Sequence, residues 1–524
     1  MDSASSSQPP SAAELGQPER RTRTALLLAM VLVIATAGLI YELVMAAVAS
    51  YVLGDSVTQF SIVIGVYLSA LGLGAYVSRF IERDLPATFV NVELAAALLG
   101  GFSAPALFLS YGFTHAFAFI LYACCIAVGV LVGLELPLLI RILQQEISFK
   151  ELIAKALTFD YAGALLGSLA FSLVLVPKLG LVHTSLACGV LNALVGLAST
   201  FVLDLNDGHR PALLRARVRA VLVLVLLALG LLQGERVLEL AESELFGGKP
   251  LVLAQSRYQR IVLGQHQGSL TLHLNGNLQF SSSDERRYHE ALVHPAMAAT
   301  RNPERVLIAG GGDGLAAREV LSWPGVREVT LVDLDPVMTD LFRSDARLTR
   351  LNAGALSNQK LRIVNEDAFV WLGREERQFD VMIFDFPDPS NYSLGKLYSD
   401  KMYRVARKRL AKDGSLAVQA TSPLFARTAY WCVIGTLESA GFNVRPYHVF
   451  VPSFGEWGFA LARHEPLAAG LPVLSRADLR YLNAETLAAS FEFPRDMQRI
   501  SADTNRLDNQ ALVTYYLREW ARWN

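Results

Sequence analysis

The sequence has few charged residues and few cysteines for its length. Only 18% of its 524 residues are Asp, Glu, Lys or Arg, and the formal net charge is −1. A chain without a basic excess lacks the electrostatic footprint of a nucleic-acid-binding protein, so we expect no nucleic-acid partner. The four cysteines have the spacing of neither a metal site nor a disulfide framework. We therefore expect no bound metal and interpret the cysteines as packed, inert thiols.

Long apolar runs dominate the N-terminal part of the chain. The mean hydropathy is +0.34 and 52% of the residues are hydrophobic, which is high for a soluble enzyme of this length. Residues 1–22, rich in Ser, Pro and Ala, are expected to form a disordered tail. The apolar runs then cover residues 24–53, 57–78, 87–110, 114–142, 152–176, 181–203 and 218–234. Most could cross about 30 Å of hydrocarbon as helices, which predicts a transmembrane helical domain over 23–236 with six or seven spans.

From about residue 250 the pattern changes to short strands. Residues 251–280 alternate around Asn275-Gly276, a hairpin signal, so 250–300 is predicted to be a small β-subdomain. Over 301–463 strands alternate with helices, which predicts a doubly wound, Rossmann-like α/β domain. Its predicted strands are 306–309, 328–332, 361–364, 381–384, 415–419, 443–449 and 458–462. Residues 464–524 are predicted to be a C-terminal helical tail, ending in an amphipathic helix that packs on the domain.

A glycine-rich turn follows the first strand of this α/β domain. Gly310 and Gly312 stand in a G-x-G-x-G spacing, with Asp313 in the turn and a helix-compatible stretch after it. Glycine allows positive φ and close approach of a ligand to the backbone. Asp333 ends the second strand about twenty residues further on, where an acid commonly accepts hydrogen bonds from ribose hydroxyls. Together these features predict an adenosine-containing cofactor.

Acidic residues follow the predicted strands one after another. They are Asp313, Asp333, Asp367, Asp385 and Asp388. Any one of them could be a helix N-cap, but carboxylates that converge on one edge of a sheet repel each other. The set therefore implies a cationic ligand. A sulfonium cofactor with an amine tail and an amine substrate fit it, whereas a phosphate-bearing dinucleotide does not.

Basic residues indicate how the spans are oriented, because they gather on the cytoplasmic side of a membrane. They lie before the first span and in alternate loops: Arg20, Arg21, Arg23, Arg79, Arg83, Arg141, Lys150, Lys155, Arg210, Arg215, Arg217 and Arg219. This predicts a cytoplasmic N-terminus in the cell (inner) membrane. Seven spans would leave residues 250–524 outside the cell. Six spans, with 218–234 re-entrant or in the membrane plane, would keep them in the cytoplasm, where the adenosine cofactor is expected.

Five motifs in the soluble part form a recognisable set. They are Tyr258-Gln259, Asp284-Glu285 with Tyr288-His289-Glu290, Gly310-Gly311-Gly312-Asp313-Gly314, Asp385-Phe386-Pro387-Asp388-Pro389 and Val451-Pro452-Ser453-Phe454. This part, from 258 to about 462, resembles the spermidine synthases, the polyamine aminopropyltransferases. With its membrane region, the chain resembles the membrane-fused, multipass members of that family.

The resemblance implies a donor, decarboxylated S-adenosylmethionine, and a set of residues that bind it. This set is Gln259, His289, Gly310, Gly312, Asp313, Asp333 and Asp367. Asp333 would bind the ribose, Asp367 the adenine amino group and Asp313 the terminal ammonium of the aminopropyl arm.

The resemblance also implies the residues on the acceptor side. Asp385 would be the catalytic base, and Tyr288 would align the attacking amine, which is putrescine or a related amine. Asp388, Gln419 and Phe454 would line the acceptor site. Phe454 stands where the family has a tyrosine, so this pocket is expected to be more apolar at its far end.

Two other functions fit the same residues. The first is a methyltransferase that uses intact S-adenosylmethionine on an amine or a lipid headgroup, and the second is a polyamine transporter or sensor without turnover. Asp313 separates the donors, because the carboxylate of the intact donor would meet this acid. We further expect a homodimer that is bound to the lipid bilayer.

Four acidic residues fall inside the predicted spans: Glu42, Glu93, Glu135 and Asp160. A charge at the bilayer centre costs roughly 3 kcal/mol on insertion scales. The acids are either protonated or close to the membrane interface, or they line a cavity for a cationic amine.

Overall fold

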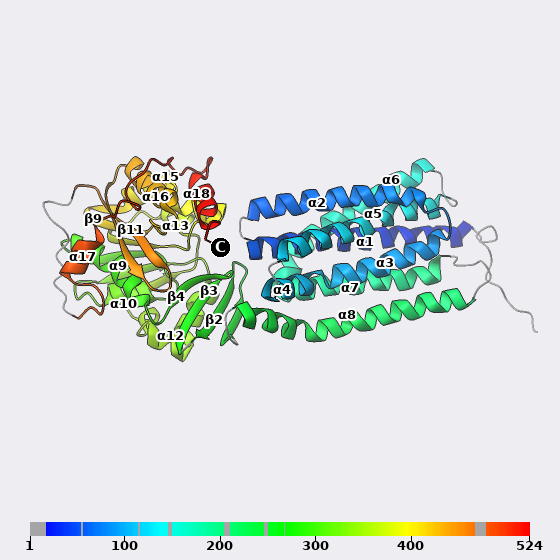
Figure 1. The fold of residues 1–524 in the computed structure, drawn as a ribbon, viewed down its shortest axis with the longest axis horizontal. Helices are drawn as coiled ribbons and strands as arrows, with labels where there is room; N and C mark the ends of the chain where they lie inside the picture. Colours follow the sequence, from blue (N-terminus) through cyan, green and yellow to red (C-terminus); the bar gives the residue numbers. More distant parts are fainter. Residues whose placement is uncertain are drawn as a thin grey trace, which may run out of the picture. The chain divides into compact units, whose positions relative to one another are not determined.

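The computed structural model describes residues 17–53, 56–113, 116–144, 149–203, 210–245, 250–266, 268–466 and 478–523. The chain divides into two compact units, Met1–Lys249 and Pro250–Asn524, which we call the helical unit and the α/β unit (Figure 1). Residues 1–16 of the expected tail lie outside the described residues, and the first helix begins at Gln17.

The described part of the helical unit consists of helices and short connections. They are α1 (Gln17–Leu53), α2 (Ser56–Val77), η1 (Ser78–Phe80), α3 (Leu85–Gly101), α4 (Ser103–Phe113), α5 (Phe117–Leu143), α6 (Phe149–Ala170), η2 (Phe171–Leu175), α7 (Val176–Val202) and α8 (Arg210–Leu245). Among the described residues, six helical stretches are long and apolar enough to cross a membrane. One of them, Lys150–Val202, is broken at Gly180, whose φ of 71° is not helical. That stretch therefore contributes two segments.

Helix α8 contains the run 218–234, which the six-span alternative treats as re-entrant or in-plane. The helix is continuous and runs antiparallel to α7, as Figure 1 shows. Arg217, near its start, donates to Thr200 Oγ1 (3.3 Å), whereas Gly234, near its end, lies against His183. Because α8 packs along the length of α7, the bundle has the seven-segment arrangement in the part of the chain that is described. The start of α1 and the end of α8 then lie at opposite ends of the helical unit.

A small antiparallel sheet opens the α/β unit. Its strands pair in chain order: β1 (Val252–Gln255), β2 (Arg260–His266), β3 (Ser269–Leu274) and β4 (Asn277–Ser281). The β3–β4 turn is Asn275-Gly276, with φ of 51° and 84°. Two consecutive positive φ angles are what a tight hairpin requires, so the hairpin prediction is confirmed.

The main sheet of the described residues has seven strands in the order β10-β11-β9-β8-β5-β6-β7. They are β5 (Arg305–Gly310), β6 (Glu328–Val332), β7 (Leu361–Val364), β8 (Phe379–Asp385), β9 (Leu410–Gln419), β10 (Asn443–Val451) and β11 (Gly455–Arg463). Each predicted strand lies within one of them. β5 to β9 are parallel, and β11 joins β9 and β10 by antiparallel pairing. The doubly wound, Rossmann-like fold is thereby confirmed.

Helices cover the main sheet, and two of them come from the C-terminal region (Figure 1). They are α9 (Glu285–Ala299), α10 (Leu315–Leu321), α11 (Pro336–Ser344), α12 (Ala346–Leu351), α13 (Ala368–Arg374), α14 (Tyr392–Gly395), α15 (Asp400–Arg409), α16 (Arg427–Ser439), α17 (Ala484–Ser490) and α18 (Ala511–Trp520). The strand order changes direction between β5 and β8. The chain adds β6 and β7 on one side of β5, and then β8 and β9 on the other side. Ligands of such sheets bind outside the carboxyl ends of the strands at this point.

Candidate active site

The turn after β5 is shaped by glycines that meet the neighbouring strands. Gly310 pairs with Asp385 at the end of β8, and a Cβ on Gly310 would lie 2.0 Å from the Asp385 carbonyl oxygen. A Cβ on Gly312 would lie 2.6 Å from the Asp333 carboxylate, which accepts a hydrogen bond from Gly312 N (3.0 Å). Larger residues cannot occupy these two positions without moving the acids. The turn and the acids therefore form one structural unit.

Asp385 and Tyr288 are in direct contact. The Tyr288 hydroxyl on α9 donates to Asp385 Oδ1 at 2.7 Å. The Tyr288 ring is held by Phe459 and Phe454, with centroids 5.3 Å and 6.1 Å away. Burial raises the pKa of Asp385, against the opposing effects of the His289 charge and the Tyr288 hydrogen bond. Together they form a buried carboxylate with a fixed orientation, which is the arrangement that a general base needs.

His289 is the cation among these acids. Its Nδ1 lies 3.0 Å from Glu285 Oε2, and Arg318 binds the same carboxylate at 2.7 Å. Burial alone would lower the pKa of His289, but the hydrogen bond and charge of Glu285 raise it to about 9. The imidazole is therefore charged at neutral pH, and it interacts electrostatically with Asp313 and Asp385.

Asp313 and Asp333 share this crowded edge of the sheet. Asp313 Oδ1 accepts from Leu315 N (2.9 Å), which fixes the carboxylate at the start of α10. Burial raises the pKa of Asp313 to about 6, although the charge of His289 opposes it, and Asp385 adds repulsion. Burial likewise raises the pKa of Asp333 to about 6 in spite of backbone hydrogen bonds to its carboxylate. A bound cation would stabilise the ionised carboxylates and thereby lower these raised pKa values.

Two predicted donor-binding residues have other partners in this structure. Gln259 Nε2 donates to Asp335 Oδ2 (2.9 Å), which ties the small sheet to the α/β fold. Asp367 accepts from Phe369 N (2.9 Å) as the N-cap of α13, and its second oxygen forms an ion pair with Lys396. The structure thus brings Tyr288, His289, Asp313, Asp333 and Asp385 together. Gln259 reaches this group through Asp335, whose backbone N–H donates to Asp333 Oδ1 (2.9 Å), whereas Asp367 is paired with Lys396. Their roles toward the donor stay predictions.

A second cluster surrounds Asp388, beyond the end of β8. Gln419 Nε2 lies 3.2 Å from Asp388 Oδ1 and 2.7 Å from the Tyr398 hydroxyl, and Thr421 Oγ1 lies 3.4 Å from Asp388 Oδ2. Burial raises the pKa of Asp388 to about 6, while hydrogen bonds from Gln419, Tyr516 and Thr421 lower it. The predicted pair Asp388 and Gln419 therefore lies in one buried polar group.

Phe454 lies in the β10–β11 turn, beside Tyr288. Its ring is tilted against Trp457, with centroids 4.9 Å apart, as well as against Tyr288. It adds an apolar surface beside the predicted amine-aligning tyrosine.

Tyr516 is a site residue that the sequence analysis missed. It lies on α18, and its hydroxyl is hydrogen-bonded to Asp388. The sequence showed Tyr515 and Tyr516 only as rings of an amphipathic helix, and no motif links them to the acids. Another motif residue, Glu290, contacts the segment just before α17. Glu290 accepts hydrogen bonds from the backbone N–H groups of residues 480–482.

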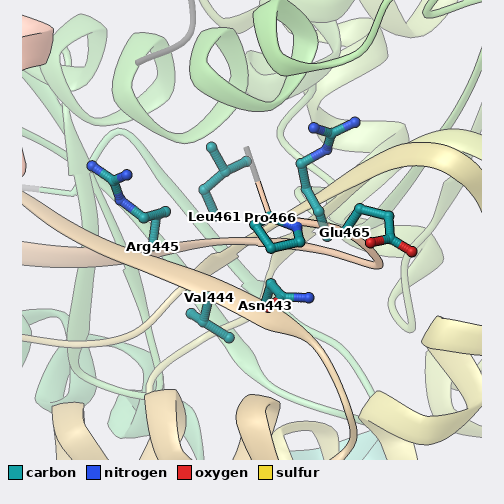
Figure 2. Close-up of a pocket in the computed structure, with 7 residues that line it drawn as sticks. Asn443, Val444, Arg445, Leu461, Glu465 and Pro466 are labelled. Carbon is teal, nitrogen blue, oxygen red and sulfur yellow. The ribbon is translucent and has the colours of Figure 1, made fainter. Parts of the chain in front are cut away.

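A shallow pocket lies elsewhere on the α/β unit (Figure 2). It is lined by Asn443, Val444, Arg445, Leu461, Arg463, Glu465 and Pro466. These residues lie at the start of β10 and the end of β11, which is the edge of the sheet opposite to the acids. Among the described residues, no group of three or more His, Cys, Asp or Glu side chains could hold a metal ion.

The fold and the acidic edge define a Rossmann-like transferase of the S-adenosylmethionine-dependent type. Residues 285–469 match the spermine/spermidine synthase domain. Over 492 residues, the chain is 46% identical to a polyamine aminopropyltransferase of Leptospira interrogans, covering 94% of this chain and 98% of that protein. It is also 46% identical to polyamine aminopropyltransferase 1 of Ralstonia nicotianae over 516 residues, which is 98% of both chains. The chain belongs to the polyamine aminopropyltransferase family, and the protein is an aminopropyltransferase.

Both matches extend over the helical unit as well as the α/β unit. A solved structure of spermidine synthase in complex with the transition state analogue AdoDATO is 26% identical, with a TM-score of 0.44, and the match covers 47% of this chain and 85% of that one. The family assignment confirms the predicted aminopropyltransferase activity. It disfavours the two alternatives, a methyltransferase and a polyamine transporter or sensor.

Proposed function

We propose that the enzyme transfers an aminopropyl group from decarboxylated S-adenosylmethionine to putrescine or a related amine. The observation that carries this proposal is the buried cluster of Asp313, Asp385 and Tyr288, with Asp388 beside it. Each partner in the proposed reaction is cationic, and each needs a carboxylate. Mass spectrometry of the products formed from putrescine and the donor tests the proposal.

The proposed reaction is a displacement at the carbon next to the sulfonium. The neutral amine nitrogen forms the new C–N bond as the C–S bond breaks, and sulfur leaves with the electron pair as a neutral thioether. The amine begins as an ammonium of high pKa, close to 10.4 for a lysine-like group, so it must first lose a proton. Asp385 accepts this proton, and Tyr288 fixes the carboxylate in line with the amine. Burial raises the pKa of Asp385 toward that of the amine, which makes the transfer easier.

On the donor side, the roles follow from charge and position. Asp313 pairs with the terminal ammonium, and Asp333 accepts hydrogen bonds from the ribose beside the turn of Gly310 and Gly312. Asp367 binds the adenine amino group once its ion pair with Lys396 has opened. Gln259 and His289 complete the proposed donor site.

On the acceptor side, we assign the distal ammonium of a diamine to Asp388. Gln419 and Tyr516 hold that carboxylate in place. Phe454 supplies an apolar wall in place of a hydroxyl. The wall favours the methylene chain of the acceptor.

Tyr516→Phe is expected to raise KM for putrescine roughly 5- to 10-fold and to change kcat by less than about twofold. The variant removes one hydrogen bond to the Asp388 carboxyl, and a net loss of about 1 kcal/mol, typical for one hydrogen bond, corresponds to this change in KM. Tyr515→Phe is the matched control, because the Tyr515 hydroxyl donates to Asp503 (2.6 Å) instead. Steady-state kinetics of both variants checks the prediction, and equal effects of the two would contradict it.

We also propose that the helical unit spans the cell (inner) membrane, that the α/β unit faces the cytoplasm, and that the enzyme is a homodimer. The six apolar helical stretches support the first part. A cytoplasmic α/β unit meets its highly charged substrates without moving them across the bilayer. The start of α1 and the end of α8 lie at opposite ends of the helical unit, so a cytoplasmic α/β unit places the N-terminus outside the cell. This orientation is opposite to the one that the distribution of Arg and Lys predicts.

Cysteine labelling decides the orientation. Gly373 is exposed on the α/β unit, and Arg83 is exposed in the connection between η1 and α3. In intact cells, a membrane-impermeant maleimide should label Arg83→Cys and spare Gly373→Cys, and permeabilised cells should show both. The reverse pattern would place the α/β unit outside, and labelling of both sites or neither would mean that α8 does not cross.

A further inference from the structure

Two carboxylates in the helical unit are buried without hydrogen-bond partners. Glu93 on α3 is 0% exposed and Glu135 on α5 is 2% exposed, and neither oxygen of either side chain has a partner. The two groups lie close enough to interact electrostatically. An isolated carboxylate in an apolar interior is strongly unfavourable unless it is paired or neutralised. The pair therefore requires either protons or a cation.

Neutral polar groups are directed at the same place. Asn192 on α7 is fully buried, and both atoms of its amide lack a partner. It shares a helix face with Gly196, where an added Cβ would lie 3.4 Å from Glu93 Cβ, so the amide faces α3. The fully buried Tyr41 hydroxyl on α1 also lacks a partner, and it interacts electrostatically with Glu93 and Glu135.

The chemistry of this group favours an ammonium over protons alone. Its acceptors are the carboxylate oxygens, the amide oxygen and the phenol oxygen, and its donors are only one amide NH2 and one O–H. Protonation would remove the charge, but no hydrogen bond joins the acids to each other or to the neutral groups among the described residues. An alkylammonium supplies both a positive charge and three N–H donors.

A third carboxylate lies near the pair. Asp160 on α6 is half-buried and interacts electrostatically with Glu135. Asp160 therefore places a partly exposed carboxylate near the buried pair.

We propose that the helical unit contains a second amine site, in which an alkylammonium group binds between Glu93 and Glu135 with Asn192 and Tyr41 as polar partners. The site lies outside the transfer reaction, and only the choice of a polyamine as its ligand rests on the proposed function. Such a site lets the helical unit take up an amine independently of the α/β unit.

The test uses the full chain in lipid nanodiscs with radiolabelled putrescine and no donor. The Asp385→Asn/Asp388→Asn variant serves as background, because it removes the carboxylates proposed to bind putrescine in the α/β unit. Saturable binding of putrescine should persist in this background. Adding Glu93→Gln and Glu135→Gln should weaken it at least 10-fold, whereas adding Glu151→Gln should not. Glu151 is the matched control, since it is an exposed acid of α6 paired with Lys155 (2.6 Å).

A second substitution covers the case in which the double variant fails to fold. Asn192→Leu leaves both acids in place and should weaken binding several-fold. The proposal is overturned if the background binds no putrescine, which is the result expected of a site that binds only protons. It is also overturned if the Glu93, Glu135 and Asn192 substitutions leave binding unchanged. Product formation by the chain with an intact α/β unit is measured separately. Its absence would refute the proposed transfer reaction and leave the result on the second site standing.

Discussion

Asp385→Asn is expected to lower kcat at least about 100-fold, the usual contribution of a positioned general base, and to leave donor binding intact. The asparagine keeps the size of the side chain and can still accept the hydrogen bond from Tyr288, which is 2.7 Å long in the wild type. It cannot take a proton from the attacking amine. Product formation measured by mass spectrometry gives kcat, and calorimetry gives the dissociation constant of the donor.

The pH profile provides a second readout of the same group. Burial raises the pKa of Asp385 above its ordinary value, so the basic form is lost as pH falls through that raised value. Wild-type kcat should therefore decline on the acidic side, and the residual rate of the asparagine variant should lack this limb. Burial raises the pKa of Asp388 to about 6. In the proposed mechanism its protonation as pH falls should therefore raise KM for the amine and leave kcat unchanged.

A control separates chemistry from structure. Asp340 is exposed on α11, where it pairs with Arg343 (2.6 Å), and Asp340→Asn should leave kcat unchanged. If Asp385 only stabilised the end of β8, Asp385→Asn would lower the melting temperature and retain near-normal turnover. That outcome would exclude Asp385 as the base.

The positions of the acids were predictable because strand ends are local features. A short apolar run that stops at an acid marks both the strand and its carboxyl end, as at Asp333 and Asp385. Parallel pairing of β5, β6 and β8 then brings these ends to one edge without further information. The glycine turn was visible for the same reason, since Gly310 must let Asp385 approach.

The partners of those acids were not predictable, because they come from distant parts of the chain. Nothing near Asp388 in the sequence indicates Tyr516, which arrives from the C-terminal helix. Nothing near Asp367 indicates the ion pair with Lys396. Periodicity finds elements, but it does not show which loops and tails fold over the sheet edge.

In the helical unit, hydropathy identified the apolar stretches but not all of their ends. The run 218–234 looked short because charged residues flank it, yet these flanks continue the helix as α8, Arg210–Leu245. The runs 152–176 and 181–203 were predicted as separate, and the structure places the break between them at Gly180, whose φ is positive. The six-span alternative arose from the apparent shortness of 218–234 and from the expectation that the adenosine cofactor lies in the cytoplasm.

Asp313→Asn is expected to weaken binding of decarboxylated S-adenosylmethionine roughly 30-fold or more, which corresponds to about 2 kcal/mol. The aminopropyl arm of this donor ends in an ammonium, and Asp313 is the buried carboxylate assigned to it. Intact S-adenosylmethionine carries a carboxylate as well, which the wild-type acid repels. The same substitution should therefore leave the binding of the intact donor little changed or slightly improved.

The dependence on pH gives this prediction its sharpest form. Burial raises the pKa of Asp313 to about 6, so the carboxylate is ionised above that pH and neutral below it. Wild-type affinity for the decarboxylated donor should fall as pH decreases through about 6, and the Asn variant should lack the part of this change that Asp313 causes. Calorimetry with both donors on either side of that pH measures the difference. Tighter binding of the intact donor by the wild type would contradict the assigned pairing, because an ionised Asp313 beside a second carboxylate disfavours that complex.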